Sequence, residues 1–233
     1  GGEQSLHFKQ FFHVLKKMGY SWAGNMHHIP FGMMLKDGKK MSTRKGKVVL
    51  LEDILLDAME LAKQNIEMRN TKLENKEDVV KAVGVGAVIF HDLKNFRLND
   101  VEFSLESMLT FEGETGPYIQ YTFARACSLL RKSSYDGAKP VSYVAYTDEN
   151  AWTVISLLMK FEEIVFHAYK QFDPSIVAKY IINLAQAFNK YYGNVKILEV
   201  DEGLEGRLQL VKATKLVLKE GLRLLGLQAP VKM

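Results

Sequence analysis

The sequence predicts a mainly α-helical protein with a mixed first part and an all-helical second part. Apolar residues recur at helical spacing through several long segments, and these segments dominate after residue 112. Short extended segments and glycine-containing turns are confined to the first half. We therefore expect the chain to divide near residue 112.

The composition is that of a globular protein with a substantial core. Of the 233 residues, 47% are hydrophobic and 25% are charged, which is ordinary for a globular domain. No apolar run is long enough to span a bilayer, so we expect no membrane association. The first ten residues lack a basic segment followed by an apolar run, so no signal peptide is expected there. The lone cysteine, Cys127, cannot form an internal disulfide, which fits a reducing compartment.

Spacing and turn residues predict the elements of the first half. Helices are expected over residues 5–18, 52–70 and 79–96. Gly84 and Gly86 oppose the third helix, because each costs about 1 kcal/mol relative to alanine. Extended segments are expected over 27–36, which runs into an Asp37-Gly38 turn, and over 47–51. Residues 99–116 are expected to be irregular.

The second half is expected to consist of helices joined by polar loops. Their predicted spans are residues 117–130, 152–165, 174–192 and 204–225. Pro117 and Pro174 suit the first turn of a helix. Asp173 can cap the third of these helices, and Thr147, Asp148 or Asn150 can cap the second.

Positive charge is concentrated in one short segment. Six basic residues and one acidic residue between Lys36 and Lys47 give +5, whereas the whole chain carries +4, so the remainder sums to −1. A local cluster of this kind indicates one anionic group, typically phosphate, although a solvated basic turn is the alternative. A P-loop is excluded, because Thr43 stands where the second glycine of that motif must be.

Four segments resemble one family. They are KKMSTRKGKVVLLEDIL, FEGETGPYIQYTFAR, FDPSIVAKYIINLAQAFNKYYGNVKIL and LKEGLRLLGLQAPVKM. The first is similar to the signature loop of class I aminoacyl-tRNA synthetases in its arginyl-tRNA synthetase form. The others resemble the start, middle helix and end of the anticodon-binding domain of that family. The resemblance implies the end of a Rossmann-like class I catalytic domain with a helical connector over residues 1–111. It also implies an all-α helical-bundle anticodon-binding domain over residues 112–233.

One motif of the family is not found. Its nucleotide-binding pair of histidines flanking a glycine has no counterpart, since His27-His28 is followed by Ile29-Pro30. The resemblance therefore implies the carboxyl part of an arginine–tRNA ligase. We expect such a chain to be unable to activate arginine alone.

The basic loop is expected to bind ATP. The resemblance implies that the loop consists of Lys40, Met41, Ser42, Arg44 and Lys45. Lys40, at the position of the family's first loop lysine, is the expected catalytic residue. A lysine that reaches the α-phosphate oxygens only in the transition state lowers the barrier. Met41 packs the loop or is simply buried. Thr43 replaces the second lysine of many relatives, and Arg44 or Lys45 is expected to supply its charge.

The helical half is expected to bind the anticodon loop, whose unstacked bases proteins recognise by stacking and hydrogen bonds. The resemblance assigns this contact to Tyr118, Thr122 and Met233, and the alternative for Tyr118 is a core position with its hydroxyl satisfied. Tyr121 and Arg125 are further candidates, with a core position and pairing to a local carboxylate as their respective alternatives. Candidate contacts to the RNA backbone are Lys190, Lys196, Arg207, Lys212 and Lys215, with a solvated helix face as the alternative for most of them.

The expected ligands follow from the same resemblance. They are tRNA(Arg), arginine, and ATP as a substrate accompanied by Mg²⁺, with no tightly bound cofactor. No protein-bound metal is expected, because the histidines lack cysteine partners and metal-ligand spacing. Cys127, in an apolar run, is expected to be buried and not nucleophilic. We expect a cytoplasmic monomer, and the alternative function is an RNA-binding helical module without catalysis.

Overall fold

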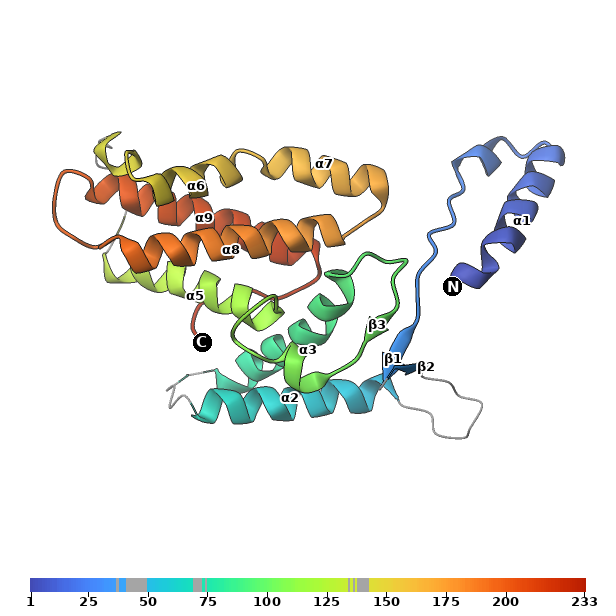
Figure 1. Ribbon diagram of the computed structural model, residues 1–233, viewed down its shortest axis with the longest axis horizontal. Coiled ribbons are helices and arrows are strands. Elements are labelled where there is room, and N and C mark those ends of the chain that lie inside the picture. The colour runs from blue at the N-terminus through green and yellow to red at the C-terminus, as the bar shows by residue number, and fades with distance from the viewer. Residues whose placement is uncertain are drawn as a thin grey trace. The chain divides into compact units, whose positions relative to one another are not determined.

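The computed structural model describes residues 1–36, 38–40, 50–68, 73, 75–133, 135, 137 and 143–233 (Figure 1). The chain forms two compact units. Unit 1 consists of Gly1–Val48 with Asn95–Ser104, and unit 2 consists of Val49–Lys94 with Leu105–Met233. These units are defined by packing, so the expected domain boundary between residues 111 and 112 stays a prediction. The described secondary structure is mainly helical, as expected.

Unit 1 combines one helix with a small sheet. Its elements are η1 (Gly2–Gln4), α1 (Ser5–Lys17), η2 (Ser21–Asn25), β1 (Met34–Lys36), β2 (Lys39–Lys40) and β3 (Val101–Glu102). The strand order is β2-β1-β3, with β1 antiparallel to β2 and parallel to β3. Gly32 allows the two chain segments to approach, because a Cβ there would lie 2.2 Å from the carbonyl oxygen of Asn99. The sheet therefore joins parts of the chain more than sixty residues apart.

Unit 2 is a helical bundle. Its helices are α2 (Leu51–Met68), α3 (Lys76–Leu93), α4 (Leu105–Met108), α5 (Gly116–Lys132), η4 (Tyr143–Tyr146), α6 (Glu149–Leu158), α7 (Phe161–Gln171), α8 (Ser175–Asn194) and α9 (Leu204–Leu224). Helix α8 packs against α5, α6, α7 and α9, and Figure 1 shows α5, α6, α8 and α9 side by side. Among the described helices, none is both long and apolar enough to cross a lipid bilayer.

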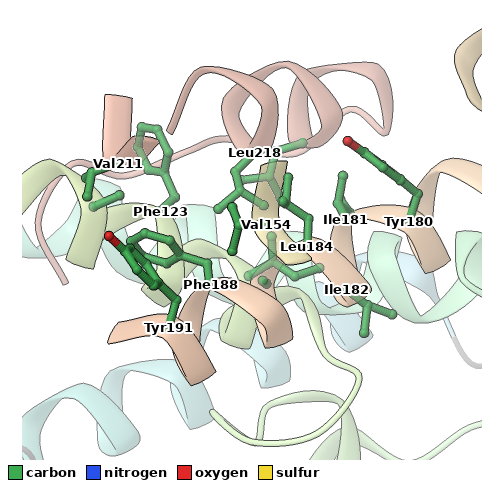
Figure 2. Close-up of a cluster of buried hydrophobic side chains, with 14 of the residues drawn as sticks. Phe123, Val154, Tyr180, Ile181, Ile182, Leu184, Phe188, Tyr191, Val211 and Leu218 are labelled. Carbon is green, nitrogen blue, oxygen red and sulfur yellow. The ribbon is translucent and has the colours of Figure 1, made fainter. Parts of the chain in front are cut away.

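The core of unit 2 lies between these helices (Figure 2). Large side chains from α5, α6, α8 and α9 meet there and are almost completely buried. They include Phe123, Val154, Leu184, Phe188, Tyr191 and Leu218. Burying a side chain of this size stabilises a fold by roughly 1.5–3 kcal/mol. The core therefore fixes the relative positions of α5 and α8, the helices that carry the candidate RNA-binding residues.

The glycines of α3 serve helix packing. A Cβ at Gly84 would lie 2.7 Å from the Cα atom of Met59 in α2, closer than real Cβ contacts permit. A Cβ at Gly86 would lie 3.0 Å from the side-chain nitrogen Nε2 of Gln120 in α5. The low helix propensity of these glycines is therefore offset by close contacts between helices.

Two expectations about the elements are wrong. Residues 152–165 form parts of two helices, because α6 ends at Leu158 and α7 begins at Phe161. The apolar spacing continues across the break and conceals it, while Glu162 and Glu163 favour a new helix start. Residues 99–116, expected to be irregular, contain β3 and α4. Both elements are too short to produce a periodic pattern.

Candidate functional site

The expected ATP-binding loop begins in unit 1. Lys40 is the second residue of β2, and its backbone pairs with that of Leu35 in β1. Gly38 has a φ of +68°, which fits the expected turn, and its N–H donates to the Glu102 carboxylate at 3.3 Å. The start of the loop is therefore attached to the sheet. The other expected loop residues, Met41, Ser42, Thr43, Arg44 and Lys45, lie outside the described residues.

The start of α5 positions the first candidate tyrosine. Thr115 is the N-cap, and its hydroxyl accepts a hydrogen bond from the Tyr118 N–H at 3.2 Å. The same hydroxyl donates to the Thr110 carbonyl at 2.6 Å. A Cβ at Gly116 would lie 3.0 Å from the Gly86 carbonyl oxygen, so the helix begins in close contact with α3. Tyr118 thus lies in the first turn of a firmly held helix, with its side chain partly exposed.

Asn189 of α8 connects the candidate residues of α5. Its Nδ2 donates to the Tyr118 hydroxyl at 2.9 Å and to the Thr122 hydroxyl at 2.8 Å. Its Oδ1 accepts a hydrogen bond from Nη1 of Arg125. Thr122 is fully buried, and its hydroxyl donates to the Tyr118 carbonyl at 2.8 Å. Thr122 therefore lies beneath the surface residues and presents no exposed surface of its own.

Arg125 lies between two aromatic rings. Its Cζ atom is 5.0 Å from the ring centre of Tyr121 and 4.5 Å from that of Tyr192. Cation–π contacts of this length are worth about 0.5–1 kcal/mol each at exposed sites. Among the described residues, the partners of Arg125 are the Asn189 amide and two rings, and no carboxylate is among them. The arrangement presents a planar cation flanked by two π surfaces.

A cavity of about 430 Å³ opens beside Arg125 and these two rings. The aromatic and basic residues that line it are Tyr121, Arg125, Arg131, Lys132, Tyr192 and Lys232. Met233, predicted from the resemblance, also lines it, as does Leu198. No aspartate or glutamate is among the described residues that line the cavity. The described lining is therefore cationic and partly aromatic.

Buried Gln120 holds the tail that brings Met233 to the cavity. Its Nε2 donates to the Ala82 carbonyl of α3 and to the Gln228 carbonyl of the tail, both at 2.9 Å. Gly226, with a φ of +76°, turns the chain out of α9 just before this contact. The last residues are thus fixed by a side chain of α5 itself.

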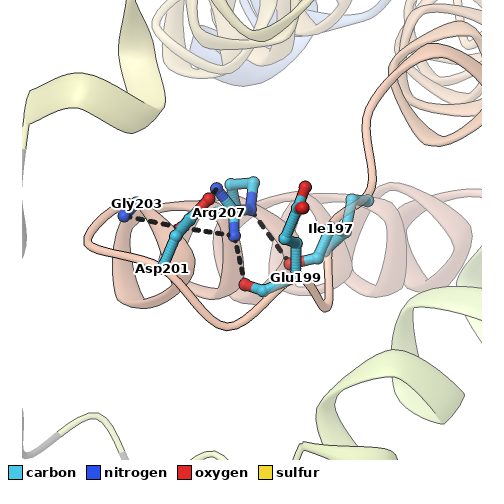
Figure 3. A network of polar contacts seen from close by, with 5 residues as sticks. All are labelled: Ile197, Glu199, Asp201, Gly203 and Arg207. Atoms are coloured by element: carbon cyan, nitrogen blue, oxygen red, sulfur yellow. Dashed lines mark hydrogen bonds and ion pairs between the residues drawn. The ribbon is translucent and has the colours of Figure 1, made fainter.

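A second network holds the loop that carries Leu198 (Figure 3). Arg207 donates to the carbonyls of Ile197 and Glu199 and to both carboxylate oxygens of Asp201. These hydrogen bonds from Arg207 hold the pKa of the Asp201 carboxyl below its usual value. Arg207 is 8% exposed, so the expectation that it contacts an RNA backbone is wrong. Its function in the described structure is to organise the α8–α9 loop.

The structure brings together most of the expected anticodon-binding residues. Tyr118, Tyr121, Thr122 and Arg125 lie on α5, while Tyr121, Arg125 and Met233 line the same cavity. Two further residues of this surface, Asn189 and Tyr192, were not indicated by the sequence. An asparagine among apolar residues in a helix interior is unusual, and this was the available signal for Asn189.

The lone cysteine, Cys127, is not among the described residues that line the cavity. Cys127 is buried as expected, and burial raises the pKa of its thiol. A raised pKa lowers the thiolate fraction near neutral pH, and the thiolate is the reactive form. Cys127 therefore serves the core of unit 2.

Comparisons with known proteins agree with this arrangement. A model of the catalytic domain of class I tRNA synthetases (R) matches residues 1–105, and a model of the DALR anticodon binding domain matches residues 119–233. An arginine–tRNA ligase 2 of Bacillus anthracis is 60% identical over all 233 residues, and an arginine–tRNA ligase of an Exiguobacterium species is 57% identical over the same span. The chain spans 41% of the length of each of these curated relatives.

Solved structures show the same likeness. Arginyl-tRNA synthetase of Thermus thermophilus superposes with a TM-score of 0.86 at 32% identity, covering 95% of this chain and 38% of that one. The Plasmodium falciparum enzyme superposes with a TM-score of 0.83 at 27% identity, covering 99% of this chain and 40% of that one. With two domain models matched in order and similarity over its whole length, the chain belongs to the arginyl-tRNA synthetase family.

Proposed function

We propose that the chain serves arginine–tRNA ligation, with unit 2 binding the anticodon loop of tRNA(Arg) and the basic loop of unit 1 binding ATP. The observation that carries the RNA-binding part is the contact of Arg125 with the rings of Tyr121 and Tyr192, beside a cavity whose described lining is cationic. Stacking of one base on an aromatic ring is worth roughly 1–3 kcal/mol. Three further basic residues line the cavity: Arg131, Lys132 and Lys232. Their positive charges would neutralise the phosphates of the bound nucleotides.

The candidate residues divide into those that touch RNA and those that support them. The residues proposed to touch RNA directly are Tyr118, Tyr121, Arg125 and Met233. All four are partly exposed. Thr122 is fully buried, so its proposed contribution is to hold Asn189 and the first turn of α5 in place. Tyr192 joins the direct contacts, because it is 41% exposed and packs on Arg125.

Lys40 is proposed to act in arginine activation. The arginine carboxylate attacks the α-phosphate of ATP and pyrophosphate leaves, so negative charge grows on the phosphoryl oxygens. A lysine placed at the start of the loop that follows β2 could approach these oxygens as that charge develops. Mg²⁺ would accompany ATP as part of the substrate. Met41, Ser42, Arg44 and Lys45 are proposed to complete the loop around the phosphates.

We propose that the chain alone does not activate arginine, because it spans 41% of the length of its curated relatives. Arginine-dependent pyrophosphate exchange by the isolated chain, with or without tRNA, would contradict this. The intact ligase is proposed to be a cytoplasmic monomer.

Anticodon recognition is tested by measuring the affinity of the 233-residue chain for an arginine tRNA and for a copy with a different anticodon. Both titrations are run at one stated salt concentration, since phosphate contacts make affinity salt-dependent. The proposal predicts that the exchanged anticodon weakens binding by roughly tenfold or more, which corresponds to one lost base contact. Equal affinities would contradict anticodon recognition and favour a general RNA-binding module.

A further inference from the structure

The amide of Asn189 has an orientation that its neighbours determine. A guanidinium group can only donate hydrogen bonds, so the Asn189 atom that faces Arg125 must be the oxygen. Thr122 has a single hydroxyl hydrogen, which it donates to the Tyr118 carbonyl at 2.8 Å. Its hydroxyl oxygen must therefore accept from Asn189, so the atom that faces Thr122 at 2.8 Å must be the nitrogen. Two independent contacts thus give the same amide orientation.

This orientation determines the hydrogen-bond polarity of Tyr118. The amide nitrogen of Asn189 also lies 2.9 Å from the Tyr118 hydroxyl oxygen and donates its second N–H there. The Tyr118 hydroxyl consequently accepts on its inner side, and its own hydrogen cannot point toward Asn189. Tyr118 is partly exposed, and no described residue accepts this hydrogen, which leaves it for a ligand.

We propose that Asn189 is a specificity-determining positioning residue that makes Tyr118 a hydrogen-bond donor to the RNA. The matching group is an acceptor on a nucleobase edge, that is, a carbonyl oxygen or an unprotonated ring nitrogen. An amino group at the same place would be rejected, because it would face the hydroxyl hydrogen. This inference rests on the proposed anticodon binding and adds the chemical class of the edge that Tyr118 reads.

The test is a double-mutant cycle between Tyr118 and Asn189, measured as affinity of the 233-residue chain for an arginine tRNA. Tyr118→Phe removes the hydroxyl. Asn189→Asp keeps the shape and the contact to Arg125 but can only accept, so it turns the Tyr118 hydrogen inward. Asn183→Asp is the matched control, because Asn183 is an exposed asparagine on the same helix and undergoes the same change of charge.

Each single change should weaken binding by about threefold to tenfold, the usual range for one hydrogen bond. In the chain that already carries Asn189→Asp, Tyr118→Phe should change the affinity by less than about twofold, because the hydroxyl no longer donates to RNA. Asn183→Asp should also stay within about twofold of the wild type. A Tyr118→Phe effect that is the same with and without Asn189→Asp would overturn the inference.

An anticodon-exchanged tRNA separates this inference from the function on which it rests. If the wild-type chain binds both tRNAs equally, anticodon binding itself fails, and the inference fails with it. If the wild type discriminates but the cycle is additive, only the role of Asn189 is overturned. Should Asn189→Asp fail to fold by circular dichroism, Asn189→Ala replaces it. Without the amide the Tyr118 hydroxyl can accept as well as donate. Asn189→Ala should therefore bind an anticodon-exchanged tRNA that presents an amino group there with a smaller penalty than the wild type, and an undiminished penalty would contradict the inference.

Discussion

At the scale of single residues, the candidate RNA-binding surface depends on a planar cation. The guanidinium of Arg125 contacts two tyrosine rings and the oxygen of Asn189 at once. A lysine ammonium is a compact point charge without a flat face, so it cannot reproduce this geometry. The surface that a base meets is therefore expected to depend on the shape of the side chain as well as on its charge.

Replacing Arg125 with lysine tests this dependence on shape. Loss of the flat surface on which a base stacks costs about 1–3 kcal/mol, so affinity for an arginine tRNA should fall by roughly fivefold or more. Arg131→Lys is the matched control, because Arg131 lines the same cavity without a described aromatic contact. It should change affinity by less than about twofold in the same titration. Equal losses in the two variants would mean that only charge matters.

Some of these residues are predictable from the sequence, and others are not, for a physical reason. Tyr118 and Arg125 lie within one helical segment, where local spacing predicts which residues share a face. Asn189 is 71 residues from Tyr118 and 64 from Arg125 in the chain, and the fold alone brings them together. Thr122 was expected beside Tyr118, but its complete burial depends on how α8 packs against α5. Periodicity gives no measure of that packing.

At the scale of secondary-structure elements, the long amphipathic helices were predictable and the short elements were not. Helices α1, α3, α5, α8 and α9 lie within about three residues of their expected ends. The break at residues 159–160 and the two-residue strand β3 were missed. The break between α6 and α7 changes neither the apolar spacing nor the composition, so the sequence does not indicate it. Strand β3 is defined by its pairing with β1, which local sequence does not indicate.

Two buried tyrosines of α8 form a matched pair for measuring packing. Tyr180 donates its hydroxyl to the Leu157 carbonyl of α6 at 2.9 Å, whereas the Tyr191 hydroxyl has no hydrogen-bond partner among the described residues. Tyr180→Phe should lower the free energy of unfolding by about 1 kcal/mol, because a hydrogen bond is lost. Tyr191→Phe should leave it unchanged or raise it slightly. Urea unfolding checks both values, and a clear loss in Tyr191→Phe would show that its hydroxyl is bonded.

The same pair gives a pH dependence whose sign can be stated. Burial raises the pKa of Tyr180 and of Tyr191 to about 12, above the ordinary value of 10. Each neutral phenol therefore contributes stability that is present below pH 10 and is lost as the pH rises from about 10 to 12. Either phenylalanine variant should show a shallower loss of stability over this range than the wild type. An unchanged slope in both variants would contradict the assignment.

At the scale of the whole molecule, the two proposed binding activities fall in different compact units. Lys40 belongs to unit 1, whereas Arg125, its aromatic neighbours and the cavity beside them belong to unit 2. The sequence indicated both activities through separate motifs and indicated a boundary near residue 112. It did not indicate that α3 packs against α5. Amphipathic spacing predicts which face of a helix is buried, but it does not identify the element that covers that face.

We propose above all that the surface formed by α5, the end of α8 and the C-terminal tail holds the anticodon loop. Ultraviolet cross-linking of the chain to the anticodon stem-loop of an arginine tRNA, followed by mass spectrometry of the peptides, tests this directly. Cross-links are predicted in peptides that contain Tyr118, Tyr121, Tyr192 or Met233, with a much lower yield for a stem-loop carrying a different anticodon. Cross-links confined to α6 and α7, or equal yields from both stem-loops, would contradict the account.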